Sequence, residues 1–450
     1  MSHRGPRHFP SLRLWSALAL LLAPAFLSLS CGSRLPTRPL SDSRVFAPRS
    51  QGTLGGAGTD EADSEVVVTL KPGVDPIAFG YQYGAVLTQD DGGGSVTYRP
   101  SAGETRDELA LRMASDPVAL ISEPNAYLET AEARQQSFAF DDGRGTPQVY
   151  ASQPSMASVG LARAHMVSDG QGVLVAILDT GAEMDHPALA GRIAGGWDFI
   201  SGDADPTDEP DGVDNDGDGF IDEARGHGTH VAGIVARVAP EARLLIVRVL
   251  DADGRGDILS VASGIRWAMN HGARVISMSF GMQHPSPTIE GLLQQAKQEG
   301  IVCVASAGNW GAEQPVDFPA SSQEVIAVGA VDAAGVPASF TSRGSFVSLT
   351  APGVEICSAY YGKRYALWSG TSMSAPFVSG TAALLLSIHP TWGPDMLMER
   401  LAAAARPLQL SSPDIADLFG DGTLDAGAAL APDMLAAGGG PRTALQHTNP

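Results

Sequence analysis

The sequence of 450 residues is poor in cysteine and in positive charge. Its three Cys are too few for a disulfide framework in so long a chain, and no repeated CxxC pattern suggests structural zinc. Lys and Arg number 29 against 50 Asp and Glu, and a net charge of −21 would repel a polyphosphate backbone. We therefore expect no nucleic-acid partner, and stability that comes from packing, helped by ions.

The composition is otherwise that of a large globular chain. Hydrophobic residues make up 44% of it, with 52 Gly and 31 Pro for tight connections. At about 150 residues per domain, the length allows roughly three folded units, or fewer if one is a large α/β domain. A single small domain is excluded.

The N-terminus has the pattern of an export signal. Arg4, Arg7 and Arg13 precede an apolar run over 14–29, which is too short and too interrupted to predict a membrane span. We therefore predict a signal peptide at 1–31 and an exported protein, either extracellular or held at a bacterial cell envelope. A solvated linker at 32–63 and a flexible tail at 431–450 are predicted from their Gly, Pro and polar composition.

Cys31 follows small residues and resembles the lipidated cysteine of bacterial lipoproteins. The pattern prefers Leu three positions before the Cys, where this chain has Ser28, with Leu27 one step earlier. Lipidation at Cys31 and plain secretion both stay open, and a lipid there is the one membrane association that we expect.

Two segments have the periodicity of folded units. Residues 64–130 alternate short strands (65–70, 95–98, 118–122) with helical stretches such as 104–114, as in a small α+β domain of ferredoxin-like type. The polar, Gly- and Pro-containing stretch 131–154 is predicted to be a linker that can be cleaved.

The larger segment, 155–430, predicts a doubly wound, mainly parallel α/β sheet. Near-continuous apolar runs are typical of strands covered on both faces, and helical spacing between them indicates βαβ crossovers. The strands are expected at 172–179, 243–250, 273–280, 300–306 and 324–331, and helices at 258–270 and 289–299. Reactive groups should then lie at the carboxyl ends of the strands.

Four polar residues stand at such ends. Asp179 ends the first strand, His227 opens the helical segment GHGTHVAG, Asn309 follows the fourth strand, and Ser372 begins a long apolar helix. A metal pair of His227 with His230 is not favoured, since zinc helix motifs place their histidines four apart. A dinucleotide-binding enzyme is not favoured either, because the first turn lacks GxGxxG.

The motifs LDTGAEMDHP, GHGTHVAG, SMSFG, ASAGN and GTSMSAP resemble those of the subtilisin-like serine proteases, in the family's order. The resemblance implies a serine endopeptidase acting on proteins or peptides, with Ser372 as nucleophile, His227 as general base, Asp179 as its orienting carboxylate and Asn309 as donor to the oxyanion. The opening EVVVTLKPGV and the closing ISEPNAY of the smaller segment resemble inhibitory propeptides of the same family. We therefore expect a precursor inhibited by its own propeptide, and a monomer.

The resemblance also implies a substrate site. A strand matching Ser279, Phe280 and Gly281 would pair with an extended substrate, and Ala305, Ser306, Ala307 and Gly308 would wall the primary specificity pocket. Asp317 matches a position near the floor of that pocket. Pointing inward, it would favour Lys or Arg at the cleaved bond; a carboxylate in a surface loop is the alternative.

Ten acidic residues and no basic one lie between Asp203 and Glu223. A solvated loop is one interpretation. The other is structural calcium, because Asp214, Asp216, Asp218, the carbonyl of Phe220 and Asp222 have the oxygen spacing of a calcium loop. Its twelfth position is Arg225 instead of Glu, so that Asp211 or Glu223 would have to complete the shell.

Two further alternatives stay open. Cys303 and Cys357 could form a disulfide or remain buried thiols. A catalytically silent, calcium-dependent binding domain is the rival to an enzyme, although no member of the expected catalytic set is replaced.

Overall fold

The computed structural model describes residues 64–410 and 413–431. The predicted signal peptide with Cys31, the linker at 32–63 and all of the tail except its first residue lie outside this range.

The smaller segment is an antiparallel sheet with two helices. It contains β1 (Val66–Leu70), α1 (Pro76–Tyr83), β2 (Val86–Asp90), β3 (Ser95–Arg99), α2 (Arg106–Ala114) and β4 (Ala119–Pro124), with the strand order β2-β3-β1-β4. Strand β2 was not expected, and its partly exposed residues show why its hydrophobic pattern is weak. The predicted α+β domain is otherwise confirmed.

The connecting segment contains short elements of its own. These are β5 (Tyr127–Glu129), β6 (Ala139–Phe140), α3 (Pro147–Ser152), α4 (Pro154–Ser158) and α5 (Leu161–Ala164). Both strands pair with the larger domain, so this segment lies on its surface over part of its length.

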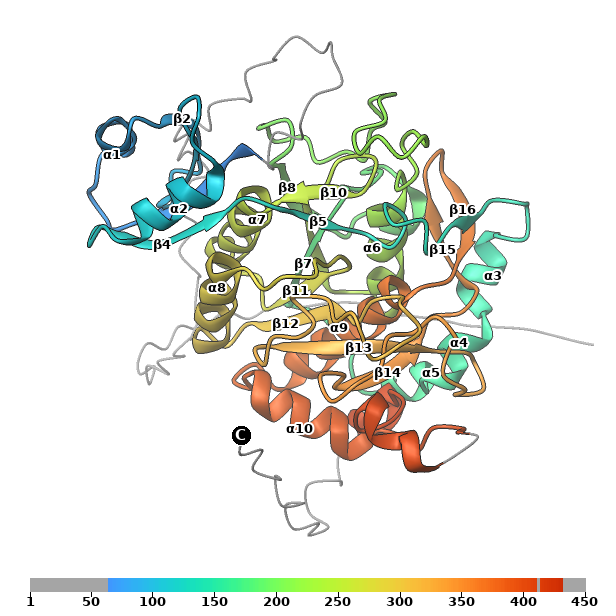
Figure 1. The fold of residues 1–450 in the computed structure, drawn as a ribbon. Coiled ribbons are helices and arrows are strands. Elements are labelled where there is room, and N and C mark those ends of the chain that lie inside the picture. The colour runs from blue at the N-terminus through green and yellow to red at the C-terminus, as the bar shows by residue number, and fades with distance from the viewer. Residues whose placement is uncertain (1–63, 411–412, 432–450) are drawn as a thin grey trace, which may run out of the picture. The chain divides into compact units, whose positions relative to one another are not determined.

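A seven-stranded parallel sheet forms the centre of the larger domain (Figure 1). Its strands are β7 (Leu174–Asp179), β8 (Ile193–Asp198), β9 (Arg243–Arg248), β11 (Val275–Met278), β12 (Val302–Ser306), β13 (Val325–Val331) and β14 (Leu349–Pro352), in the order β14-β13-β12-β11-β7-β9-β8. The predicted doubly wound α/β fold is confirmed, and the five expected strands lie within the predicted runs. The strands that follow β7 in the sequence lie on both sides of it, so the strand order reverses at β7. Ligands of such sheets bind beside the carboxyl ends of the strands at this point of reversal.

Helices cover both faces of this sheet. They are α6 (His227–Val238), α7 (Ile258–Asn270), α8 (Pro287–Gln298), α9 (Thr371–Ile388), α10 (Pro394–Ala404) and α11 (Ala426–Ala429), besides the 3₁₀ turns Pro187–Leu189 and Pro413–Phe419. Successive side chains of β7 point to opposite faces. Val175 and Ile177 join a core with α6 and α9, whereas Ala176 and Leu178 join a second core with α7 and α8.

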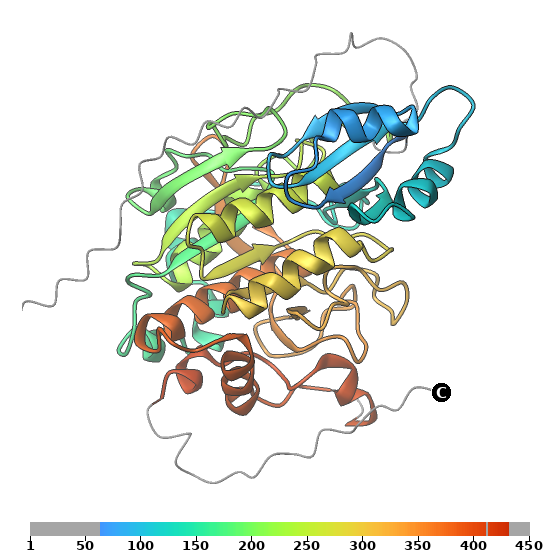
Figure 2. The same ribbon diagram turned by 90° about the vertical axis from the view of Figure 1, so that its left-hand side faces the viewer.

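Three further strands, β10 (Arg255–Asp257), β15 (Ile356–Tyr360) and β16 (Arg364–Trp368), lie outside the large sheet. The smaller domain packs beside α7 and α8, as the view in Figure 2 shows. Val67 of β1 takes part in the same apolar core as these two helices.

Helix α9 is, in the part of the chain that the structure describes, the one helix long and apolar enough to cross a bilayer. It is 89% buried in the protein. We therefore assign it as a core helix, whose role is to hold the residues at its N-terminus.

Candidate active site

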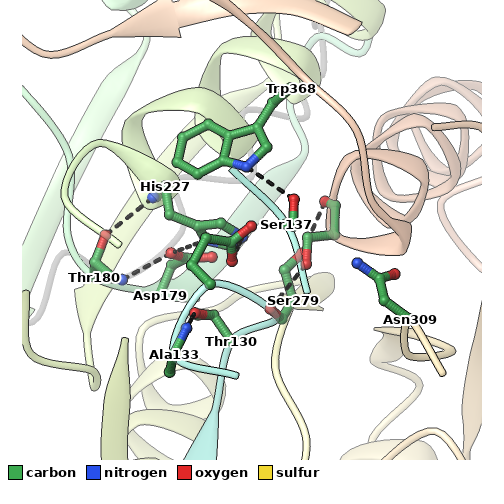
Figure 3. Close-up of polar contacts among 12 residues, drawn as sticks. Thr130, Ala133, Ser137, Asp179, Thr180, His227, Ser279, Asn309 and Trp368 are labelled. Atoms are coloured by element: carbon green, nitrogen blue, oxygen red, sulfur yellow. Dashed lines mark hydrogen bonds and ion pairs between the residues drawn. The ribbon is translucent and has the colours of Figure 1, made fainter. Parts of the chain in front are cut away.

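A buried ion pair joins the ends of two elements. Nδ1 of His227, the first residue of α6, lies 2.7 Å from Oδ1 of Asp179, the last residue of β7. Both side chains are almost completely buried. Because Nδ1 faces a carboxylate, it carries a proton, and Nε2 is the ring nitrogen left for chemistry. Figure 3 shows the pair.

Ser372 lies at the start of α9, beside the same centre. Its hydroxyl donates to the carbonyl of Ser279 at 3.3 Å, and the hydroxyl of Ser279 donates to the carbonyl of Ser372 at 3.1 Å. As the second residue of the helix, Ser372 has a backbone N–H without an intrahelical acceptor. The positive end of the helix dipole is thus available to an anion at this point.

Asn309 offers a side-chain donor to the site. Its Oδ1 accepts from the backbone N–H of Thr371 at 3.0 Å and from the hydroxyl of Thr371 at 2.9 Å. These two bonds fix which way the amide is turned, so that Nδ2 faces the centre of the site (Figure 3). Nδ2 is buried and has no hydrogen-bond partner among the described residues. Such a free, oriented donor is what a developing oxyanion requires.

The surroundings of the imidazole hold it in place. Trp368 lies edge-on to it, with ring centroids 5.5 Å apart. Asp208 is buried behind the pair and accepts from Thr180, Gly226 and Thr229. His230 turns away, since its Nε2 donates to the carbonyls of Ile356 and Ala366, which excludes a metal pair with His227.

The site is covered by the chain's own segment 127–137. Strand β5 pairs with β10, Leu128 lying opposite Gly256. Glu129 exchanges two backbone hydrogen bonds of 2.9 Å with Gly281, and the N–H of Thr130 donates to Gly254. The segment therefore lies between two edges of the larger domain as an added strand.

After Thr130 the segment turns over the centre of the site. The N–H groups of Gln135 and Gln136 donate to the carbonyls of Glu132 and Ala131, which closes a turn. Oε2 of Glu132 lies 3.5 Å from Nε2 of His227, and both side chains are buried. Nε2 forms no hydrogen bond among the described residues, so the imidazole and the hydroxyl of Ser372 are not bonded in this state.

The neighbouring carboxylates and the burial of the ring determine the pKa of His227. Burial lowers the pKa of His227, but the carboxylates of Asp179 and Glu132 outweigh it and raise the pKa to about 9. In this state His227 is therefore protonated at neutral pH.

The expected substrate residues divide into two groups. Those that line the small cavity beside Ser372 are Ser279, Phe280, Gly281, Ser306, Gly308 and Asp317. Ala305 and Ala307 are fully buried and are not among its lining residues. Asp317 is 2% exposed, which rules out a carboxylate in a surface loop.

The acidic loop brings three of its expected ligands together. Carboxylate oxygens of Asp214, Asp216 and Asp218 lie within 4.8 Å of one another. Asp222 is outside this group, since its carboxylate accepts from the backbone of Asp211 and Gly212. Both oxygens of Glu223, in the same loop, are buried without a donor, but Glu223 is not part of this group of three. The chemistry of this donor set therefore fits calcium.

The two cysteines of the described part, Cys303 and Cys357, are buried and free. The disulfide alternative is wrong, and the buried-thiol alternative is confirmed.

The profile of the Subtilase family matches residues 170–425, more than half of the chain. The chain belongs to the subtilase family. It is thus a serine endopeptidase with proteins as substrates, and the interpretation as a silent binding domain is set aside.

This subtilase is 42% identical over 269 residues to the thermostable alkaline protease of Halalkalibacterium halodurans, over 58% of this chain and 68% of that protein. It is 39% identical over 269 residues to Subtilisin BL of Lederbergia lenta, over 58% of this chain and 91% of that protein. It is 35% identical over 322 residues to Subtilisin E of Bacillus subtilis, over 68% of this chain and 76% of that protein.

Three residues and one strand of the subtilase site have no clear signal in the sequence. They are Glu132, Arg134, Asp208 and strand β10. Asp208 stands among nine other acids that resemble it, and β10 has only three residues. Glu132 and Arg134 lie in a stretch without periodicity, so no local signal places them in the site.

Proposed function

We propose that Ser372 is the nucleophile of this endopeptidase, with His227 as general base and then acid, Asp179 as the orienting carboxylate and Asn309 as a donor to the oxyanion. The observation that carries this assignment is the buried 2.7 Å contact of His227 with Asp179, beside a serine at a helix start. A serine hydroxyl is too weakly acidic to attack an amide alone at neutral pH, so a neighbouring imidazole has to take its proton.

Each group has one task in the proposed reaction. Nε2 of His227 accepts the proton as Oγ of Ser372 attacks the carbonyl carbon, and it later gives that proton to the leaving amine. Asp179 stabilises the imidazolium without taking its proton. Nδ2 of Asn309 and the N–H of Ser372 stabilise the negative charge on the carbonyl oxygen. An acyl-enzyme forms on Ser372, and water then hydrolyses it.

The chain is, in our proposal, made as a self-inhibited precursor. Glu123 accepts from Ser286 and from the N–H of Thr288 at the start of α8. Asn125 accepts from the N–H of Ile258 at the start of α7. Together with the strand pairing of Glu129, these contacts support an inhibitor domain at 64–130 that delivers its last residues into the substrate site.

Maturation follows from the same contacts. The strand pairing ends at Thr130, and Glu132 contacts the proposed base, so the turn 131–136 passes next to the nucleophile. We propose that self-cleavage within this turn separates residues 64–130 from the peptidase domain at 155–430. The predicted signal at 1–31 supports export before this step, either by plain secretion or with a lipid at Cys31, and a monomer remains our expectation.

Calcium is the proposed structural ion. Asp214, Asp216 and Asp218 would hold it, with the carbonyl of Phe220 and the carboxylate of Glu223 as further ligands. The bound ion would neutralise crowded carboxylates and so stabilise the loop that leads to His227.

Intact masses of the full chain and of its Ser372→Ala variant test the catalytic proposal. We expect only the unmutated chain to lose its N-terminal part, because cleavage needs the hydroxyl. A Ser374→Ala variant is the matched control, since Ser374 is a buried serine of the same helix. An unmutated chain that keeps its N-terminal part, as the Ser372→Ala chain does, would contradict self-processing.

A further inference from the structure

The small cavity beside Ser372 ends at a buried carboxylate. Asp317 lines it together with Gly281 and Gly308, and Nε1 of Trp310 donates to Oδ2 of Asp317 at 3.1 Å. The other lining residues of the peptidase domain carry no charge; they are Ser279, Phe280, Ser306, Asn309, Thr371 and Ser372. Asp317 is thus the negative charge that an entering side chain meets.

Glycines on both sides make room for this carboxylate. A Cβ atom at Gly281 would lie 2.8 Å from Cβ of Asp317, and one at Gly308 would lie 2.5 Å from its Oδ2. Gly308 also has a backbone φ of +97°, a value that residues with a Cβ atom rarely adopt. The walls therefore leave Asp317 open toward the cavity.

The chain's own Arg134 occupies this cavity. Nη1 lies 3.0 and 2.9 Å from the two carboxylate oxygens of Asp317, and Nη2 donates to the carbonyl of Gly281. Nε donates to Glu129 at 3.2 Å. The guanidinium lies 5.4 Å from the centre of the Trp310 ring. Each of its three nitrogen atoms thus has an acceptor.

Three of the four residues that contact Arg134 belong to the peptidase domain and stay there after processing: Asp317, Trp310 and Gly281. Glu129, like Arg134 itself, precedes the peptidase domain. Burial raises the pKa of Asp317, and Arg134 opposes this effect. Once Arg134 has left, a buried carboxylate with one neutral donor remains, and such a group favours a new cation.

We propose that Asp317 makes this subtilase select Arg, and less strongly Lys, on the N-terminal side of the cleaved bond, and that Arg134 is the built-in occupant of the same pocket. This inference rests on the proposed function, since the pocket can select a substrate side chain only if Ser372 is the nucleophile. Arg is preferred because its planar fork can reach both the carboxylate and the carbonyl of Gly281.

The test uses the processed protein prepared from the full chain. Its kcat/KM is measured on peptide p-nitroanilides that differ only in the residue before the cleaved bond: Arg, Lys, citrulline or Phe. Citrulline has nearly the shape of Arg without its charge. We expect Arg to exceed citrulline on the order of 100-fold, because the neutral ureido group leaves the buried carboxylate without an opposite charge.

The Asp317→Asn variant, similar in shape, should lose on the order of 100-fold on the Arg substrate and keep its rate on Phe. Glu313→Gln is the matched control, an exposed carboxylate of the same loop that should change neither rate. The Arg-to-citrulline ratio of the unmutated protein decides the question if Asp317→Asn does not fold.

Equal rates on Arg, citrulline and Phe would overturn this inference while leaving the proposed function intact. Failure of a fluorophosphonate to label Ser372 in the same preparation would overturn the proposed function, and this inference with it.

Discussion

The carboxylate of Glu132 lies 3.5 Å from Nε2 of His227, on the ring edge opposite the one that contacts Asp179. In our proposal Nε2 is the atom that takes the proton of Ser372. Neither oxygen of Glu132 has a hydrogen-bond partner among the described residues. Glu132 therefore occupies the reacting edge of the base and favours its protonated, inactive form.

Self-processing should accelerate as the pH rises. Burial lowers the pKa of His227, but Asp179 and Glu132, with Asp208 in the same direction, raise it to about 9. Because attack needs the neutral imidazole, the rate of self-cleavage should rise about tenfold per pH unit from pH 7 toward pH 9 and then level off. Intact mass at timed intervals measures it.

The Glu132→Gln variant should shift this profile to lower pH. It removes one of the two carboxylates that contact the imidazole, so the pKa of His227 falls and processing at pH 7 becomes faster. Glu129→Gln is a control, because Glu129 is not among the groups that raise this pKa. A profile that does not change in Glu132→Gln would contradict the role given to this carboxylate.

The free energy of unfolding of the precursor should fall as the pH rises. The pKa of His227 is raised above its ordinary value of 6.5. The stabilisation that His227 contributes is therefore complete below pH 6.5 and is lost as the pH rises through about 9. Urea unfolding of the Ser372→Ala chain, which we expect not to process itself, should show lower stability at pH 9 than at pH 6.5. An increase over this window would be incompatible with the pKa direction.

Asn309→Ala should lower kcat with little change in KM. Loss of one oxyanion donor costs about 10²- to 10³-fold, a value known from subtilisin itself. Asn309→Asp separates the two roles of this side chain, because it keeps the acceptor for Thr371 and removes the donor. Both variants should be slow on a peptide substrate, and a near-normal kcat in Asn309→Asp would exclude the donor role.

The new N-terminus should lie inside the turn 131–136. The extended pairing ends at Thr130, and the chain pairs again with the larger domain only at Ala139. We therefore expect the cleaved peptide bond between these points. N-terminal sequencing of the processed protein checks this, and a terminus in α3 would place the cleaved bond elsewhere.

Removal of calcium should destabilise the Ser372→Ala chain. An ion at 100 times its Kd adds about 2.7 kcal/mol, which corresponds to roughly 3–5 °C in Tm for a chain of this size. Differential scanning fluorimetry with calcium and with EGTA measures the difference. Asp216→Asn should reduce it, whereas Asp332→Asn, in a turn outside the acidic loop, should not. An equal Tm with and without calcium would favour the solvated-loop interpretation.

The sheet and its helices were predictable because their patterns are local. A strand such as 174–179 is covered on both faces and is apolar along its whole length. Asp179 and His227 were predictable through their motifs. What the sequence could not show is that they would be 2.7 Å apart, since 48 positions separate them.

The blocking segment could not be predicted, and neither could the orientation of Asp317. Arg134 and Asp317 are 183 positions apart and come together because β5 pairs with β10 and Glu129 pairs with Gly281. The turn 131–136 is held by its contacts with the larger domain, and such a turn has no hydrophobic periodicity in its sequence. Asp317 likewise lies in a loop whose polar composition suits a surface position.

Labelling with a fluorophosphonate, followed by peptide mass spectrometry before and after processing, shows whether Ser372 is the nucleophile. We predict one labelled residue, Ser372, with labelling that is weak in the precursor and complete in the processed protein, and that is lost in His227→Ala. A processed protein in which Ser372 stays unlabelled, or in which another serine carries the label, would contradict the account.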